Sequence, residues 1–268
     1  MTVKSRTPTI GSVTLVGGGP GPVDLMTMRA IRALEAADVV LYDRLGPRTA
    51  HTQYAPTAKH IYVGKRPGHH RMTQSDINAS LIEHALLGRN VVRLKGGDPY
   101  VFGRGGEELD ACVLAGIPVS VVPGISSALS VPGAAGIPIT HRGISTKFTV
   151  ISGHDPLSSD ECRALALLGG TVVILMGMGT LNQTVQSFMD AGFADQTPAA
   201  IIERGLSEQQ RITTAPLPRL AQAAHDVGCV SPAVVVIGEV AARCVQTGQG
   251  GSEQFPDDLI QLISQCRV

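Results

Sequence analysis

The stretch VTLVGGGPGPVDL (Val13–Leu25) decides the fold of the first half of the chain. An apolar run, Val13–Val16, leads directly into a glycine-rich loop, which predicts a buried strand followed by a tight turn. The loop does not match the dinucleotide fingerprint GxGxxG, because Pro22 stands where the third glycine belongs. Pro20 and Pro22 also lack the N–H groups that hold a pyrophosphate at a helix start. Taken alone, the loop is equally consistent with a turn that binds no ligand.

Short apolar runs alternate with helical patterns on both sides of this stretch, which predicts parallel strands covered by helices. The strands expected in the first half are Val13–Val16, Val39–Tyr42, Ile61–Val63, Val91–Leu94 and Val119–Val122, with helices at Asp24–Ala37 and Asp76–Leu87. The strands expected in the second half are Phe148–Ser152, Val172–Met176, Ala200–Glu203, Arg211–Thr214 and Val234–Ile237. The helices expected there are Ser126–Val131, Ser159–Leu168, Leu181–Ala191, Leu217–Asp226 and Asp257–Cys266.

A passage rich in glycine and proline, Pro123–Gly143, separates the two sets of elements and predicts a domain junction. We therefore expect an α/β fold of two α/β domains, residues 10–123 and residues 124–250, with a tail helix at 254–267. Their sheets are expected to be mostly parallel or mixed, with a cleft between the domains. Clefts of this kind are common sites for small ligands.

The composition favours a cytoplasmic enzyme that acts on a small molecule. The 22 basic and 22 acidic residues balance, so no overall positive field attracts nucleic acid or a membrane surface. Aromatic residues make up only 3% of the chain, which argues against base stacking. The five cysteines are scattered without a CxxC pair, so we expect neither a metal site nor disulfides. We find no signal peptide and no apolar run of the roughly 20 residues that span a membrane.

Three further loops follow predicted strands, so they should gather with the first loop at the carboxyl edge of the sheet, where open α/β sheets bind ligands. They are VVLYDRLG (Val39–Gly46), YVGKRPGHH (Tyr62–His70) and VVRLKGGDPYVFGRGGEE (Val91–Glu108). In these loops the chain resembles the tetrapyrrole methylases, and among them most resembles the uroporphyrinogen III C-methyltransferases. The resemblance continues through Val121–Gly143, Val172–Gly179, Ile201–Gly205 and Ser231–Gly238.

This resemblance implies the tetrapyrrole methylase fold and a homodimer. It implies that S-adenosyl-L-methionine is the methyl donor and S-adenosyl-L-homocysteine a product. The acceptor would be uroporphyrinogen III, methylated on rings A and B to give precorrin-2 via precorrin-1, for sirohaem and cobalamin biosynthesis. The cofactor contacts that the matched motifs imply are Pro20, Gly96, Gly97, Asp98, Val101, Ser126, Ser127, Met176, Gly205 and Ala233.

The same resemblance matches Asp43 to a proton acceptor and Lys65 to a proton donor. A carboxylate can remove the proton lost as the macrocycle rearranges, and a lysine can return one. Two alternatives stay open: Asp43 could cap a turn, and Lys65 could bind a substrate carboxylate. The tetrapyrrole carries several carboxylates, and guanidinium groups recognise carboxylates in pairs of hydrogen bonds. The candidate substrate-binding residues in the matched loops are Arg44, Arg66, Arg104 and Arg142.

The first loop departs from the family pattern Gly-Ala-Gly-Pro-Gly-Asp, because Gly18 and Pro22 replace its alanine and aspartate. Asp24 is the nearest acid that could take the place of the aspartate. Three other functions stay open: a methylase acting later in corrin synthesis, a tetrapyrrole-binding protein without turnover, and a dehydrogenase. The loops that resemble a cofactor site argue against the second, and Pro22 argues against the third.

Overall fold

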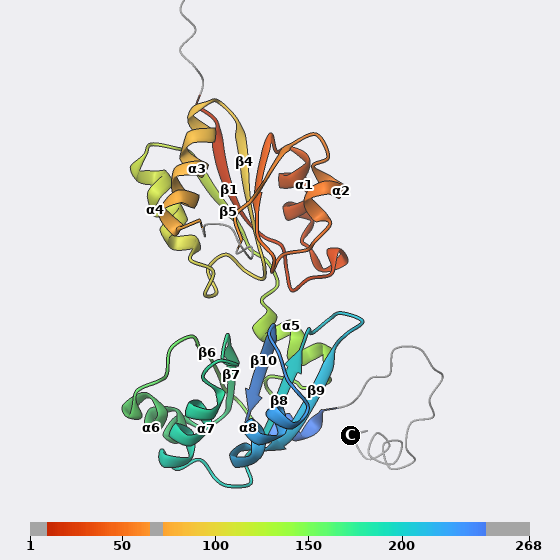
Figure 1. Cartoon of the computed structure of the whole chain (residues 1–268), viewed down its shortest axis with the longest axis vertical. Coiled ribbons are helices and arrows are strands. Elements are labelled where there is room, and N and C mark those ends of the chain that lie inside the picture. The colour runs from red at the N-terminus through yellow and green to blue at the C-terminus, as the bar shows by residue number, and fades with distance from the viewer. Residues whose placement is uncertain (1–9, 65–71, 245–268) are drawn as a thin grey trace, which may run out of the picture.

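The computed structural model describes residues 10–64 and 72–244, which form two five-stranded sheets with helices packed on them (Figure 1). The first sheet is entirely parallel, with the strand order β3-β2-β4-β1-β5. Its strands are β1 (Ser12–Gly17), β2 (Val39–Tyr42), β3 (Lys59–Tyr62), β4 (Asn90–Lys95) and β5 (Val119–Val122). The helical segments around it are η1 (Val23–Leu25), α1 (Met28–Glu35), α2 (Ala50–Tyr54), α3 (Gln74–Leu86) and α4 (Gly105–Leu114).

Strand β2 shows why these short runs form a parallel sheet. Val39, Val40 and Leu41 are all fully buried, although successive side chains point to opposite faces of the sheet. Val39 and Leu41 belong to the apolar cluster that also contains residues of α3, and Val40 belongs to the cluster that contains residues of α1. Because both faces are covered, continuous apolar runs are favoured over alternating ones.

The second sheet is mixed, with the order β6-β7-β10-β8-β9 and only the pair β6–β7 parallel. Its strands are β6 (Phe148–Ser152), β7 (Thr171–Leu175), β8 (Pro198–Glu203), β9 (Arg211–Pro216) and β10 (Ala233–Ile237). The helical segments that accompany it are α5 (Ser127–Ala134), α6 (Ser159–Leu168), α7 (Leu181–Asp190), α8 (Leu217–Asp226) and η2 (Glu239–Arg243). One apolar cluster packs α6, α7 and α8 on one face, and another packs α5 and η2 on the other.

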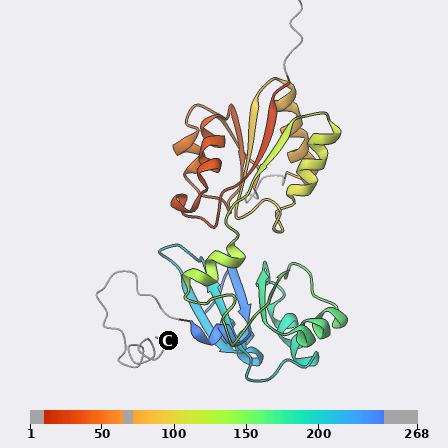
Figure 2. The same ribbon diagram turned by 180° about the vertical axis from the view of Figure 1, so that it is seen from behind.

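The α/β class and the two sheets, one parallel and one mixed, are confirmed. Helix α5 packs against β7 and β10 and so lies with the second sheet (Figure 2). The last strand of the first sheet along the chain, β5, ends at Val122. The proposed division at residues 123 and 124 and the cleft between the domains stay predictions. The tail helix at 254–267, including Asp257–Cys266, lies outside the described residues. In the described ranges, no helix is long and apolar enough to span a membrane.

The structure corrects one helical prediction and adds helices α2 and α4, which were not predicted. The helix expected over Asp24–Ala37 is interrupted, because Thr27 adopts an extended conformation and its hydroxyl accepts a hydrogen bond from Ala30 N at 3.2 Å, which starts a new helix. Helix α4 was not expected, since it opens with Gly105 and Gly106, which are poor helix formers. Two glutamates in its first turn favour this start through the helix dipole.

A small cluster of rings lies beside β2. His51 of α2 stacks on Tyr42 with ring centroids 3.8 Å apart, and His60 of β3 meets His51 edge-on at 4.9 Å. His51 is only 8% exposed, and its Nδ1 atom has no hydrogen-bond partner. Burial, followed by the charge on His60, lowers the pKa of His51 from 6.5. The folded protein therefore favours the neutral form of His51.

We predict that this histidine makes the protein less stable in mild acid. Because its pKa is lower in the folded state, the unfolded chain takes up a proton first, and stability falls as the pH drops below about 6.5. The substitution His51→Phe keeps the stacked ring and removes the titration. We expect it to reduce the loss of melting temperature between pH 7 and pH 5, measured by calorimetry. The matched control is His225→Phe, at a side chain that is 86% exposed. Equal losses in both variants would contradict the prediction.

Candidate active site

The loops after β1 and β4 pair with each other at the carboxyl edge of the first sheet. Gly97 N donates to Gly19 O at 2.7 Å, and Gly19 N donates to Gly97 O at 3.2 Å. Gly18 N donates to Lys95 O at 2.8 Å. Pro20 follows this paired segment directly. The structure thus brings together Pro20 and Gly97, two of the residues expected to contact the cofactor.

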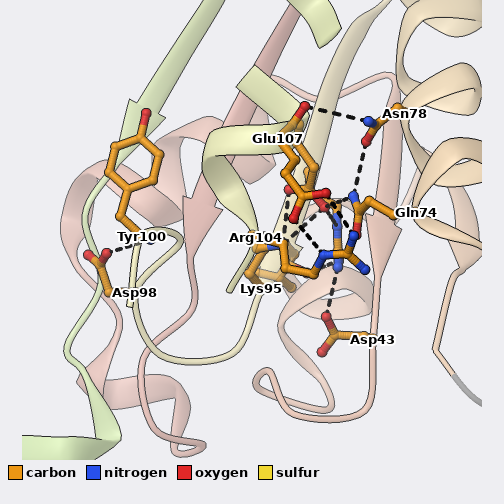
Figure 3. A network of polar contacts seen from close by, with 11 residues as sticks. Asp43, Gln74, Asn78, Lys95, Asp98, Tyr100, Arg104 and Glu107 are labelled. Atoms are coloured by element: carbon orange, nitrogen blue, oxygen red, sulfur yellow. Dashed lines mark hydrogen bonds and ion pairs between the residues drawn. The ribbon is translucent and has the colours of Figure 1, made fainter. Parts of the chain in front are cut away.

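Asp98, also expected at the cofactor, holds the backbone around this loop. Its Oδ2 atom accepts a hydrogen bond from Gly124 N at 3.0 Å. Its Oδ1 atom accepts one from Tyr100 N at 2.8 Å, which Figure 3 shows. The first bond ties the end of β4 to the segment that leaves β5. Val101 lies on the same loop and is 37% exposed.

The adjacent glycines Gly96 and Gly97 differ in what surrounds them. A Cβ atom on Gly96 would lie 2.6 Å from the carbonyl oxygen of Leu45, so this glycine is required by packing. A Cβ atom on Gly97 would find its nearest neighbour at 3.9 Å, on Ser127 at the start of α5. Gly97 also has a positive φ of 65°, which favours glycine. Of the two, only Gly97 has room for a Cβ atom, at ordinary contact distance from the backbone of Ser126 and Ser127, and we call this its open side. The contact of Gly96 with the cofactor stays a prediction.

We predict that side chains at these two positions have different effects. Gly97→Leu should cost roughly 1–2 kcal/mol of backbone strain but still fold, and should abolish binding of S-adenosylhomocysteine by filling the open space. Gly96→Ala should lower the melting temperature more, because its methyl group meets Leu45 O. Calorimetric titration with S-adenosylhomocysteine and thermal unfolding check both. A folded Gly97→Leu variant with unchanged affinity would contradict the pocket.

The cofactor contacts expected from the second half also lie together. Ala233 begins β10 opposite Glu203 of β8, and Val234 pairs with Leu175 in antiparallel register, so Ala233 and Met176 are the next residues beyond that pair, one on each strand. Gly205 follows β8 by two residues, and a Cβ atom there would lie 2.4 Å from Val131 Cγ1 of α5. Glycine at 205 is therefore required by the close approach of α5.

Backbone strain is concentrated at the same strand ends. Met176 has a φ of 60°, Arg204 of 47° and Leu206 of 65°. Non-glycine residues in this region cost about 1–3 kcal/mol each and are most common at functional sites. Met176 is also 47% exposed, so its side chain is available to a ligand.

Helix α5 links the two groups of residues. Ser126 caps it, and its hydroxyl accepts from Ala128 N at 3.2 Å. The backbone of Ser126 and Ser127 lies nearest to the open side of Gly97, whereas Val131, one turn further on, packs over Gly205. The residues fit a cofactor of mixed character, because an uncovered backbone, hydroxyl groups and exposed apolar side chains converge here.

Asp43, the expected proton acceptor, is held by two contacts. Its Oδ2 atom forms an ion pair with Arg93 Nη2 at 2.9 Å, and its Oδ1 atom accepts from Leu45 N at 3.0 Å (Figure 3). The carboxylate thus caps a turn, as one alternative foresaw, and it also keeps 22% of its side chain exposed. Lys65, the expected proton donor, lies outside the described residues.

Arg93 belongs to a buried charge network that the sequence analysis missed. Glu108 of α4 is fully buried and accepts from Arg93 Nε at 3.1 Å and from Lys95 Nζ at 2.9 Å. Gln74 Nε2 of α3 donates to the same carboxylate at 3.3 Å. The pKa of Lys95 is lowered, mainly by burial and secondly by the positive charge of Arg93. The available signal was the pair of cations at alternate positions in the apolar strand VVRLK, which places both on one face.

We predict that this network depends on Glu108. Glu108→Gln leaves Lys95 buried without its counter-charge, and removal of one partner of a buried pair costs about 3–5 kcal/mol. Urea unfolding should show a loss of this size. The neighbouring Glu107→Gln is the matched control, because Glu107 is 54% exposed in its pair with Arg104 and should leave the midpoint near that of the wild type. Equal midpoints for both variants would contradict the prediction.

The candidate substrate-binding arginines are only partly gathered. Arg44 is exposed and adjacent to Asp43. Arg104 is 52% exposed and forms two hydrogen bonds of 2.7 Å to Glu107. Arg142 is exposed in a turn before β6, and Arg66 lies outside the described residues. In residues 10–64 and 72–244, no group of three histidine, cysteine or acidic side chains could hold a metal ion.

The family model of the tetrapyrrole (corrin/porphyrin) methylases matches residues 12–221. An S-adenosyl-L-methionine-dependent uroporphyrinogen III methyltransferase of Methanosarcina barkeri is 45% identical over 234 residues, which cover 86% of this chain and 92% of the relative. A sirohaem synthase of Gluconacetobacter diazotrophicus is 44% identical, and the match covers 88% of this chain and 51% of that protein.

One solved structure is similar to this chain in both fold and sequence. The uroporphyrin-III C-methyl transferase of Thermus thermophilus, complexed with S-adenosylhomocysteine, superposes with a TM-score of 0.74 and is 39% identical. The match covers 87% of this chain and 99% of that chain.

Proposed function

The chain belongs to the tetrapyrrole methylase family, and on this basis we propose that it is a uroporphyrinogen-III C-methyltransferase that uses S-adenosyl-L-methionine. The observation that carries the proposal is the open side of Gly97 facing the start of α5, beside the loop that bears Asp43. The relatives from Methanosarcina barkeri and Thermus thermophilus support the choice of donor and acceptor.

The proposed reaction places methyl groups on rings A and B, giving precorrin-2 via precorrin-1 and S-adenosyl-L-homocysteine. Sirohaem and cobalamin biosynthesis would both use this product. The similarity to a sirohaem synthase supports the first route, although the chain spans about half the length of that relative. We also propose that the enzyme is cytoplasmic and that it forms a homodimer. Light scattering, which measures the molar mass in solution, would test the homodimer.

S-adenosyl-L-methionine, when bound, supplies an electrophilic methyl group on a sulfonium. The chain's own task is to position the acceptor carbon against it, and correct positioning can supply several kcal/mol. We assign the donor to Pro20, Gly96, Gly97, Asp98, Val101, Ser126, Ser127, Met176, Gly205 and Ala233. We assign the acidic side chains of the tetrapyrrole to Arg44, Arg66, Arg104 and Arg142, of which Arg104 would exchange Glu107 for a substrate carboxylate.

Asp43 is proposed to accept the proton that the methylated macrocycle releases. Arg93 and Leu45 N hold its carboxylate in one orientation, and 22% of the side chain stays exposed to solvent. Such a fixed base contributes typically 100-fold to 10,000-fold in rate. Lys65 is proposed to return a proton, from a segment outside the described residues.

The direct test is an anaerobic assay with labelled S-adenosyl-L-methionine and uroporphyrinogen III, followed by mass analysis of the product. The proposal predicts the addition of two methyl groups. Cofactor binding without transfer would move the acceptor to a later corrinoid or favour a binding protein. Failure to bind S-adenosylhomocysteine would overturn the proposed function.

We predict that Asp43→Asn separates binding from turnover. The affinity for S-adenosylhomocysteine should stay within a factor of about two of the wild type, while kcat should fall by about 100-fold or more. Titration calorimetry and the methyl-transfer assay measure the two quantities. Asp160→Asn on α6 is the matched control, since its side chain is 89% exposed and pairs with the exposed Arg163. Full activity in Asp43→Asn would remove the proposed role.

A further inference from the structure

We propose that Glu203 is a positioning residue for the cofactor site, because its carboxylate clamps the segment 228–230 in the place from which Ala233 and β10 begin. The proposal rests on the proposed function, since it takes Met176, Gly205 and Ala233 as cofactor contacts. It concerns a buried acid that has no part in the proton transfer assigned to Asp43.

The clamp consists of one buried carboxylate with several donors. Glu203 is 1% exposed at the end of β8. Its Oε2 atom accepts from Arg211 Nε at 2.7 Å, and its Oε1 atom accepts from Arg211 Nη2 at 2.9 Å and from Val230 N at 2.9 Å. These charge-assisted bonds are stronger than neutral ones and fix geometry as well as distance.

Arg211 extends the clamp to the other end of the segment. Its Nη2 atom also donates to Gly228 O at 3.0 Å. The hydrogen bonds from Arg211, ahead of the one from Val230 N, hold the pKa of Glu203 down to about 2, so the carboxylate is charged at neutral pH. Gly228 and Val230 are thus both tied to the same carboxylate–guanidinium pair.

The clamped segment leads directly to the expected cofactor contacts. Three residues after Val230, Ala233 opens β10 as the register partner of Glu203 itself. Between them, Pro232 O accepts from Arg204 N at 2.8 Å, and Arg204 precedes Gly205. Met176 lies beside Ala233 on the opposite side, after β7. A shift of segment 228–230 would therefore move the wall formed by Gly205 and Ala233.

The arrangement has the features of a positioning device. A fully buried carboxylate is costly unless all its oxygens are paired, and both oxygens of Glu203 are. Its donors belong to the Arg211 side chain of β9 and to segment 228–230, where Val230 N and the Cys229 thiol donate. Replacement of the carboxylate by an amide keeps the shape but turns one acceptor into a donor that faces Arg211 or Val230 N.

The test compares Glu203→Gln with the wild type for binding and for turnover. We expect the Kd for S-adenosylhomocysteine and the KM for S-adenosyl-L-methionine to rise about tenfold, with the KM for uroporphyrinogen III and kcat changing less than about twofold. A merely structural role would lower the melting temperature without this division between the two substrates. Asp160→Asn, a carboxylate-to-amide change in an exposed ion pair of the same half, should alter none of these quantities.

A second variant keeps the proposal testable if Glu203→Gln does not fold. Arg211→Lys keeps a positive charge beside the buried Glu203 but cannot form both hydrogen bonds to its carboxylate, so it should fold and should also raise the Kd for S-adenosylhomocysteine. Wild-type affinity in a folded Glu203→Gln or Arg211→Lys protein would overturn the role of Glu203 and leave the proposed function standing. No binding of S-adenosylhomocysteine by the wild type would overturn the proposed function, and the role of Glu203 with it.

Discussion

Direct contact between glycine backbones, where β1, β4 and β5 end, is the constraint on which the rest of the site depends. A Cβ atom on Gly124 would lie 2.1 Å from Gly97 O, and one on Gly17 would lie 2.5 Å from Gly124 N. No side chain can stand at either position without separating the strand ends. The contact holds the loop after β4 against the chain segment that leaves the first sheet, and Asp98 locks it through Gly124 N. Gly124 packs against the carbonyl oxygen of Gly97, and the Cβ position of Gly97 remains unfilled.

Each sheet also contains a buried carboxylate that holds positively charged side chains, and the two carboxylates do so in different ways. In the first sheet Glu108 holds Arg93 and Lys95 together in the interior, and Arg93 in turn presents Asp43 at the surface. In the second sheet Glu203 binds outward to Arg211, whose guanidinium is half exposed, and fixes a loop. Both carboxylates act through an arginine of a strand, Arg93 within β4 and Arg211 at the start of β9.

The local elements were predictable wherever periodicity and β-branching agreed, as at Val39–Tyr42 and Phe148–Ser152, which match the observed strands residue for residue. Helix α4 was not predictable from propensity, because its stability comes from Glu108 and the sheet below it. The antiparallel place of β10 between β7 and β8 depends on long-range pairing that no local pattern encodes. The Arg93–Asp43 pair joins residues 50 positions apart, so the sequence pointed to Asp43 through its motif and not to its partner.

The central claim is that residues from both halves of the chain form one cofactor site around the start of α5. A crystal structure of the protein with S-adenosylhomocysteine tests it most directly. The account predicts that the ligand contacts Gly97 and the first turn of α5 on one side, and Met176 and Ala233 on the other. A ligand bound at the strand ends of one sheet only, or at a site remote from α5, would contradict the account.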